Sequence, residues 1–270
     1  MRRTEVLNKK GKINTIVEEY NNFKEFCAVQ NDRPLVWDMS FPTRDETNNS
    51  DKRCNSFDEA QNYLLHGFDE NVAEMVSAVG TLSKTGTRMR NQRYADVVGF
   101  APIVPNAIIG IPTSMMNVRK KPIKTKVVTI DYDPTVDWSV SPKEVLDFGC
   151  RFINCVLNLE RQGYRVRINY LATATSDNNQ YILRIPLKSE FNPLNIKRMS
   201  FPLTHVAMLR YLFMDWEERL PNSKYLSGHG IPLYACDSKQ RENVRNVLGD
   251  GSYLVTFKTD VETMFKQIDN

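Results

Sequence analysis

The sequence predicts an α/β protein with an open, mostly parallel sheet and helices on both faces. The prediction depends on residues 124–171, where a predicted strand, a helix and a second strand follow one another. The first strand is the apolar run from Val127 to Ile130, and the second is the alternating stretch from Tyr164 to Leu171. Such units build parallel sheets and place ligand sites at the carboxyl ends of their strands.

The helix of this unit has signals at both ends. Ser141 occupies the N-cap position, Pro142 the first helical position and Glu144 the third position after the cap. Gly163 is a typical helix stop. Between these signals, apolar residues recur at helical spacing, which predicts a buried face. They are Val145, Phe148, Phe152, Ile153, Val156 and Leu159.

The second half of the chain alternates predicted strands and helices, as a three-layer α/β fold requires. Strands are expected at Tyr181–Leu187, Ile231–Ala235 and Ser252–Phe257. Helices are expected at Thr204–Leu220, Lys239–Leu248 and Asp260–Ile268. We therefore assign residues 124–270 to one α/β domain.

Residues 1–123 predict a mainly helical region that packs on this domain. The expected helices are Lys12–Gln30, Ser56–His66 and Asp69–Leu82, from their apolar spacing. An irregular connector from Val97 to Met116 is apolar and carries three prolines, which interrupt helices and sheets. We expect it to pack across the sheet or to join the two regions. The alternative is an exposed surface that docks another protein.

The composition is that of a soluble globular protein, with 41% apolar and 25% charged residues. The five cysteines form no Cys-x-x-Cys pair, which predicts reduced thiols and a cytoplasmic location. The N-terminus lacks the apolar core of a signal peptide, and the longest apolar stretch is too short and too interrupted by prolines to span a bilayer. We therefore expect no membrane partner.

Two basic segments are candidates for nucleic-acid binding, because clustered cations beside an aromatic ring can hold a phosphate backbone and stack a base. Tyr94 provides the ring. The cations are Arg88, Arg90, Arg93, Arg119, Lys120 and Lys121. The alternative is a solvated face balanced by acidic residues, since the net charge of the chain is only +4.

An acidic cluster at the end of the first predicted strand is a candidate divalent-cation site. Asp131, Asp133 and Asp137 offer carboxylate oxygens, which suit Mg²⁺ or Ca²⁺. The alternative is that these aspartates form a turn before the helix. Mg²⁺ is the one cofactor that the sequence indicates.

No catalytic signature accompanies this cluster. The sequence has no glycine-rich phosphate motif and no Gly-x-Ser-x-Gly turn, and its three histidines lack metal-ligand spacing. These absences favour a binding protein over an enzyme.

The motif Asp131-x-Asp133-x-Thr135 resembles that of a diverged von Willebrand factor A type domain, whose members carry Asp-x-Ser-x-Ser after the first strand. The resemblance implies a divalent cation held by these three residues and by Thr173 from a later segment. In this chain Asp133 and Thr135 stand where the family has its two serines.

Residues 56–68, 103–116, 139–149 and 159–168 together resemble an uncharacterised family of bacteriophage and mobile-element proteins. The resemblance implies a phage or prophage protein in the host cytoplasm or the virion. We expect a non-enzymatic protein that binds an unidentified protein partner in virion assembly, packaging or host interference. The alternatives are a nucleic-acid-binding protein that uses the six cations, and a metal-dependent phosphodiester hydrolase.

Overall fold

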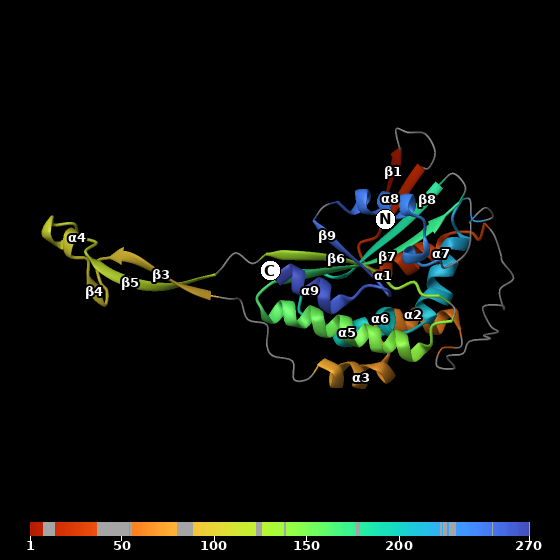
Figure 1. Cartoon of the computed structure of the whole chain (residues 1–270), viewed down its shortest axis with the longest axis horizontal. Coiled ribbons are helices and arrows are strands. Elements are labelled where there is room, and N and C mark those ends of the chain that lie inside the picture. The colour runs from red at the N-terminus through yellow and green to blue at the C-terminus, as the bar shows by residue number, and fades with distance from the viewer. Residues whose placement is uncertain are drawn as a thin grey trace.

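We describe a computed structural model of the 270-residue chain, in which a six-stranded α/β body carries a separate β arm (Figure 1). The structure describes residues 1–7, 14–36, 54, 56–79, 89–122, 126–137, 139–176, 179–221, 223, 226, 231–249 and 251–269. None of the described helices is both long enough and apolar enough to cross a membrane.

The sheet of the body is mostly parallel, as predicted. Its strands lie in the order β1-β2-β8-β7-β6-β9. Three of the five neighbouring pairs are parallel, namely β2–β8, β7–β6 and β6–β9. The strands are β1 (Arg2–Leu7), β2 (Asn14–Glu19), β6 (Val127–Asp133), β7 (Arg165–Thr175), β8 (Asn179–Lys188) and β9 (Ser252–Thr256).

Helices cover both faces of this sheet, which confirms the predicted layers. On one face lie α1 (Phe23–Asp32), α2 (Phe57–His66), α3 (Asp69–Val79), α5 (Pro142–Arg161), α6 (Ile196–Thr204), α7 (Met214–Glu218) and α9 (Val261–Asp269). On the other face α8 (Ser238–Leu248) buries Val244 against Leu171 and Ile182 of the sheet.

Helix α5 forms as its sequence signals predict. Ser141 and Glu144 make the reciprocal hydrogen bonds of a capping box, and Gly163 closes the helix with φ of 96°. Phe152 is fully buried, and its ring stacks on Tyr132 of β6 with centroids 5.0 Å apart. Aromatic packing of this kind fixes the helix to the strand that carries both aspartates of the predicted site.

The prediction of a helix over Lys12–Gln30 is wrong for its first part. Asn14–Glu19 forms β2, and the helix begins only at Phe23, where Asn22 caps it. β2 lies inside the sheet and is buried on both sides, so its apolar residues run continuously and do not alternate. A short continuous apolar run does not distinguish a buried strand from a helix.

Two later predictions also need correction. The predicted strand Ile231–Ala235 is a 3₁₀ turn at Leu233–Ala235, because Pro232 has no N–H for a strand ladder. The predicted helix Thr204–Leu220 is interrupted, since α6 ends where His205 adopts extended backbone. It continues as a π-helical turn, Met208–Phe213, and α7.

A mainly helical N-terminal region is not confirmed, because strands as well as helices form before residue 124. β1 and β2 join the main sheet beside β8, so the sheet extends across the predicted boundary at residues 123 and 124. The arm is also part of this region. It consists of β3 (Met89–Asp96), β4 (Ala101–Pro102), the short helix α4 (Val104–Ile108) and β5 (Met115–Pro122).

The expectation that the Pro-rich connector packs across the sheet is wrong. This segment forms the end of the arm, which extends away from the body (Figure 1). Val98 is 72% exposed and Ile108 is 79% exposed. The prolines stop β3 and β5 from continuing as a regular hairpin, and nothing in the described chain covers the segment instead.

Candidate functional sites

The end of the arm is an exposed apolar surface, which we call the tip (residues 97–114). The tip contains no charged residue. It holds seven of the fourteen large hydrophobic side chains that are exposed among the described residues. They are Val97, Val98, Phe100, Val104, Ile108, Ile109 and Ile111. A concentration of this kind is typical of interaction surfaces, whereas single exposed apolar residues are ordinary.

Backbone and amide hydrogen bonds hold the tip in shape. The N–H of Phe100 donates to the Met116 carbonyl at 2.9 Å, and the N–H of Ile103 donates to the Ser114 carbonyl at 2.7 Å. Asn117 Nδ2 donates to the Val98 carbonyl at 3.1 Å. No residue of α4 is buried, so the apolar side chains of the tip do not serve as a core.

A close backbone approach makes glycine necessary within the tip. A Cβ at Gly99 would lie 2.1 Å from the carbonyl oxygen of Met116, which is far inside van der Waals contact. Any other residue would push β5 away from this position and change how the tip is presented.

The stem of the arm, β3 paired with β5, carries the predicted basic cluster. In the antiparallel register Arg90 faces Lys121, and Arg93 faces Val118. Arg119 lies over the Tyr94 ring, 4.9 Å from its centroid, so a cation and an aromatic ring do meet here. Five of the six predicted cations therefore lie on two neighbouring strands, and Arg88 lies outside the described residues.

The stem also accounts for the net charge of the protein. Residues 89–122 contain five Lys and Arg residues and one Asp, a net charge of +4, which equals the net charge of the whole chain. Arg93, Arg119 and Lys120 are exposed. The arm thus combines a basic stem with an uncharged apolar tip.

The second predicted site lies on the α8 face of the sheet. Asp131 is buried in β6, and its carboxylate accepts hydrogen bonds from three neighbouring strands. Arg184 donates through Nε at 2.8 Å and through Nη2 at 3.1 Å, Asn169 Nδ2 donates at 2.9 Å, and Ser252 Oγ donates at 2.5 Å. The charge of Asp131 is therefore paired, and both of its oxygens have donors.

Asp133 is also buried, but it has no cationic partner among the described residues. Its carboxylate accepts from the backbone N–H and the hydroxyl of Thr135, and from the N–H of Leu233 at 3.0 Å. Burial raises the pKa of Asp133 to about 6, against the opposing effect of these hydrogen bonds. Asp133 thus ties the 3₁₀ turn to the end of β6.

All four predicted metal ligands lie on one face at the carboxyl end of β6 and β7. Asp131, Asp133 and Thr135 are close in sequence, and Thr173 is buried on the neighbouring strand β7. Among the described residues, no group of three or more His, Cys, Asp or Glu side chains is arranged to hold a metal ion. The Mg²⁺ site, and the hydrolase that would use it, stay predictions.

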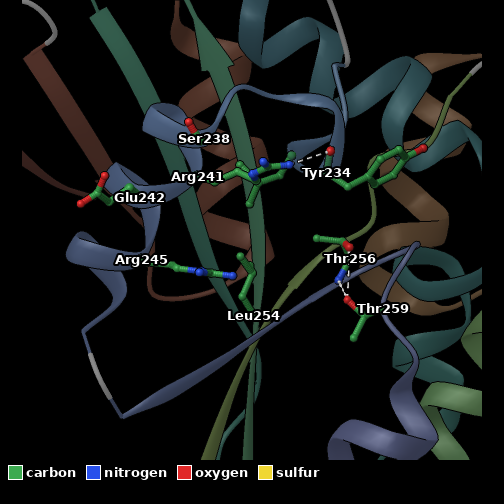
Figure 2. A pocket seen from close by; sticks show the side chains of 9 residues that line it. Tyr234, Ser238, Arg241, Glu242, Arg245, Leu254, Thr256 and Thr259 are labelled. Carbon is green, nitrogen blue, oxygen red and sulfur yellow. Dashed lines mark hydrogen bonds between the residues drawn. The ribbon is translucent and has the colours of Figure 1, made fainter.

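The sequence interpretation missed a cavity of about 410 Å³ between α8 and β9 (Figure 2). It is lined by Leu233, Tyr234, Ser238, Arg241, Glu242, Arg245, Leu254, Thr256 and Thr259. A signal was present, because Ser238, Arg241 and Arg245 recur at helical spacing in and beside a predicted helix. Nothing in the sequence showed that this face of the helix borders a cavity.

The fold and its sites define an α/β protein with a projecting β arm and a cavity beside an edge strand. Residues 3–269 match the family described as "Domain of unknown function (DUF7192)", and the chain belongs to this family. No curated protein and no solved structure matches the chain.

Removal of the Asp131 carboxylate tests the metal site. Asp131→Ala leaves Asn169 and Ser252 without their acceptor and leaves Arg184, among the described residues, only its 3.6 Å ion pair with Glu19. We therefore expect the unfolding free energy to fall by about 1–3 kcal/mol, as for other unsatisfied buried donors. Because both carboxylate oxygens already have donors, we expect the wild type to melt at the same temperature in millimolar Mg²⁺ and in EDTA. Asp147→Ala, at an exposed position of α5, is the control. A Mg²⁺-dependent rise in melting temperature that Asp131→Ala abolishes would establish a cation site.

The raised pKa of Asp133 predicts a pH dependence of stability. The native state holds this proton more tightly than the unfolded state, so unfolding free energy falls as pH rises from about 4 to 6, by up to about 3 kcal/mol, and then levels off. Asp133→Asn lacks this titration, and the unpaired donor that it introduces beside Leu233 adds an offset independent of pH. Urea melts of wild type and variant at several pH values in this range give the unfolding free energy of each. The difference between the two unfolding free energies should become smaller as the pH rises. A constant difference would mean that the pKa of Asp133 is not raised.

Proposed function

We propose that this protein acts by binding another macromolecule through the arm, with the tip as the docking surface for a protein partner. The observation that carries the proposal is the concentration of exposed apolar side chains on a projecting, uncharged tip. Binding without catalysis is part of the proposal.

Burial of the tip would supply ample binding energy. Each large aliphatic or aromatic side chain that leaves water on binding contributes about 1.5–3 kcal/mol. The tip is already held by its own hydrogen bonds, so docking orders little additional backbone. Two strands of eight residues make a stem of about 27 Å, long enough for the tip to enter a groove on a partner.

The biological setting is part of the same proposal. A phage or prophage protein, in the host cytoplasm or the virion, is supported by the resemblance of residues 56–68 and 103–116. The likeness to a von Willebrand factor A type domain is supported by the parallel strands β7, β6 and β9, with Asp131 and Asp133 on β6.

Site-specific photocrosslinking tests the docking surface. A photoreactive residue at position 108, introduced in cells that produce the protein, should capture a defined protein. The matched control is position 191, because Phe191 is 83% exposed but lies on the body. With the captured partner purified, Ile108→Ser should bind about tenfold or more weakly, since 1.4 kcal/mol corresponds to a factor of ten. Phe191→Ser should bind like the wild type.

Two results would contradict the protein-docking proposal. One is the absence of any protein adduct from position 108 when position 191 reacts normally. The other is equal affinity of Ile108→Ser and wild type for the captured partner. An adduct between two copies of the chain would identify the partner as a second copy.

A second candidate function is nucleic-acid binding by the stem. The specific observation in its favour is that the stem holds the whole net positive charge of the protein and brings Arg119 onto Tyr94. Phosphate contacts and ring stacking are the two features of sequence-tolerant binding to single strands.

A gel-shift titration at two salt concentrations tests this candidate. With about four phosphate contacts, affinity for single-stranded DNA should fall about 50-fold between 50 and 200 mM salt. Arg119→Gln with Lys120→Gln should weaken binding at low salt and flatten the salt dependence, because two contacts are lost. Lys143→Gln with Arg151→Gln removes the same charge from exposed positions of α5 and is the control. No shift at low salt, or equal binding by both double variants, would dismiss the stem as a nucleic-acid site.

A further inference from the structure

The cavity beside α8 lies at the position where ligands bind in open α/β sheets. From β6 the chain passes through α5 to β7 on one side, and β9 pairs with β6 on the other side. α5 covers one face of the sheet and α8 covers the opposite face. The crevice at the carboxyl ends of β6 and β9 is therefore a topological switch point. Thr256, the last residue of β9, lines the cavity there.

Two arginines reach from one face of α8 into this cavity. Arg241 and Arg245 extend toward β9, whereas Glu242, the one acidic residue of the lining, turns away from it (Figure 2). In the part of the chain that the structure describes, no carboxylate lies within 4.0 Å of either guanidinium. Like charges four residues apart on a helix repel each other, and an anion between them would remove that repulsion.

The turn beside the cavity holds Arg241 in place. Its Nη1 donates to the carbonyl of Tyr234 at 3.1 Å, and its remaining N–H groups stay available for a ligand. A guanidinium fixed in this way loses little side-chain freedom when it binds an anion.

Hydroxyl groups line the opposite wall. The Thr259 hydroxyl accepts from the N–H of Thr256 at 2.9 Å and lies 3.2 Å from the Thr256 hydroxyl. Ser238, at the start of α8, lines the cavity on the same wall as the two arginines. Leu254 lies along β9 beneath Arg245 (Figure 2), so the cavity has an apolar base as well as polar walls.

We propose that this cavity binds a small phosphate-bearing ligand. Arginines on one wall and threonine hydroxyls on the other suit a phosphate group, whose oxygens accept several hydrogen bonds at once and whose charge at neutral pH opposes that of the arginines. The volume of about 410 Å³ accommodates a phosphate ester with a small organic part, within the usual range of ligand pockets. The site is independent of the arm, so it goes beyond the macromolecular binding proposed above.

Isothermal titration calorimetry with three probes tests the site. Inorganic phosphate, pyrophosphate and AMP are titrated separately into the full-length protein, with sodium chloride of equal ionic strength as the salt control. At least one probe should bind the wild type. Arg245→Gln should bind that probe about tenfold or more weakly, because a charge-assisted hydrogen-bonded pair is lost. Arg151→Gln, an exposed arginine on α5, should bind it like the wild type.

The order of affinities identifies the source of the phosphate. Tighter binding of AMP than of inorganic phosphate means that the organic part of the ligand contributes to binding. Tighter binding of pyrophosphate than of inorganic phosphate means that the ligand is an oligophosphate. Among the described residues, Arg245 makes no hydrogen bond to the 3₁₀ turn, so Arg245→Gln leaves the turn intact, whereas Arg241→Gln would remove the bond to Tyr234. The proposal is overturned if none of the probes binds at millimolar concentration, or if Arg245→Gln and Arg151→Gln bind equally. Ile108→Ser should bind the probe like the wild type, because the tip is not part of the cavity. The phosphate-site proposal can therefore be contradicted without affecting the docking proposal, and the reverse also holds.

Discussion

One buried carboxylate connects four neighbouring strands of the sheet. Asp131 lies on β6 and accepts hydrogen bonds from Asn169 on β7, Arg184 on β8 and Ser252 on β9. A buried charge without partners would be very unfavourable, so these strands must keep the order and register in which all of their donors reach Asp131. The pairing of β7 with β8 and of β6 with β9 is thereby coupled through a single side chain.

The two faces of the sheet differ in composition, since one is largely apolar and the other carries buried charged groups. On the α5 face Tyr132 and Phe152 form part of an apolar aromatic core. On the α8 face Asp131 and Asp133 make a polar layer, and the apolar cluster beneath α8 is small. Most hydrophobic stabilisation therefore comes from the first face, and the second face has room for charged groups and a cavity.

The parts of the fold that could be predicted are those with local signals. Ser141, Glu144 and Gly163 mark the ends of α5 in the sequence itself, and the structure confirms them. The role of Asp131 could not be predicted, because Arg184 is distant in sequence and no local pattern shows that the two meet. Its acidic neighbour Asp133 made a metal site a natural interpretation. β2 was missed because burial on both faces removes the alternation that identifies a strand.

The candidate sites, too, depend on contacts between residues that are distant in sequence. The basic residues of the stem were recognised from composition, but their pairing across β3 and β5 follows from the hairpin register. An uncharged apolar segment such as the tip has the composition of a core, and only the three-dimensional structure shows that it lies outside one. The cavity depends on how α8 sits relative to β9, which is a matter of tertiary packing.

The net positive charge of the molecule is concentrated in the arm. The formal charges outside residues 89–122 sum to zero, so the arm holds the net charge of +4. The field of a polyanionic surface attracts this charge before contact and turns the arm toward the surface. Diffusing partners of negative charge therefore meet the arm first, and the body follows behind it. Salt screens this alignment, because the Debye length at physiological ionic strength is only about 8 Å.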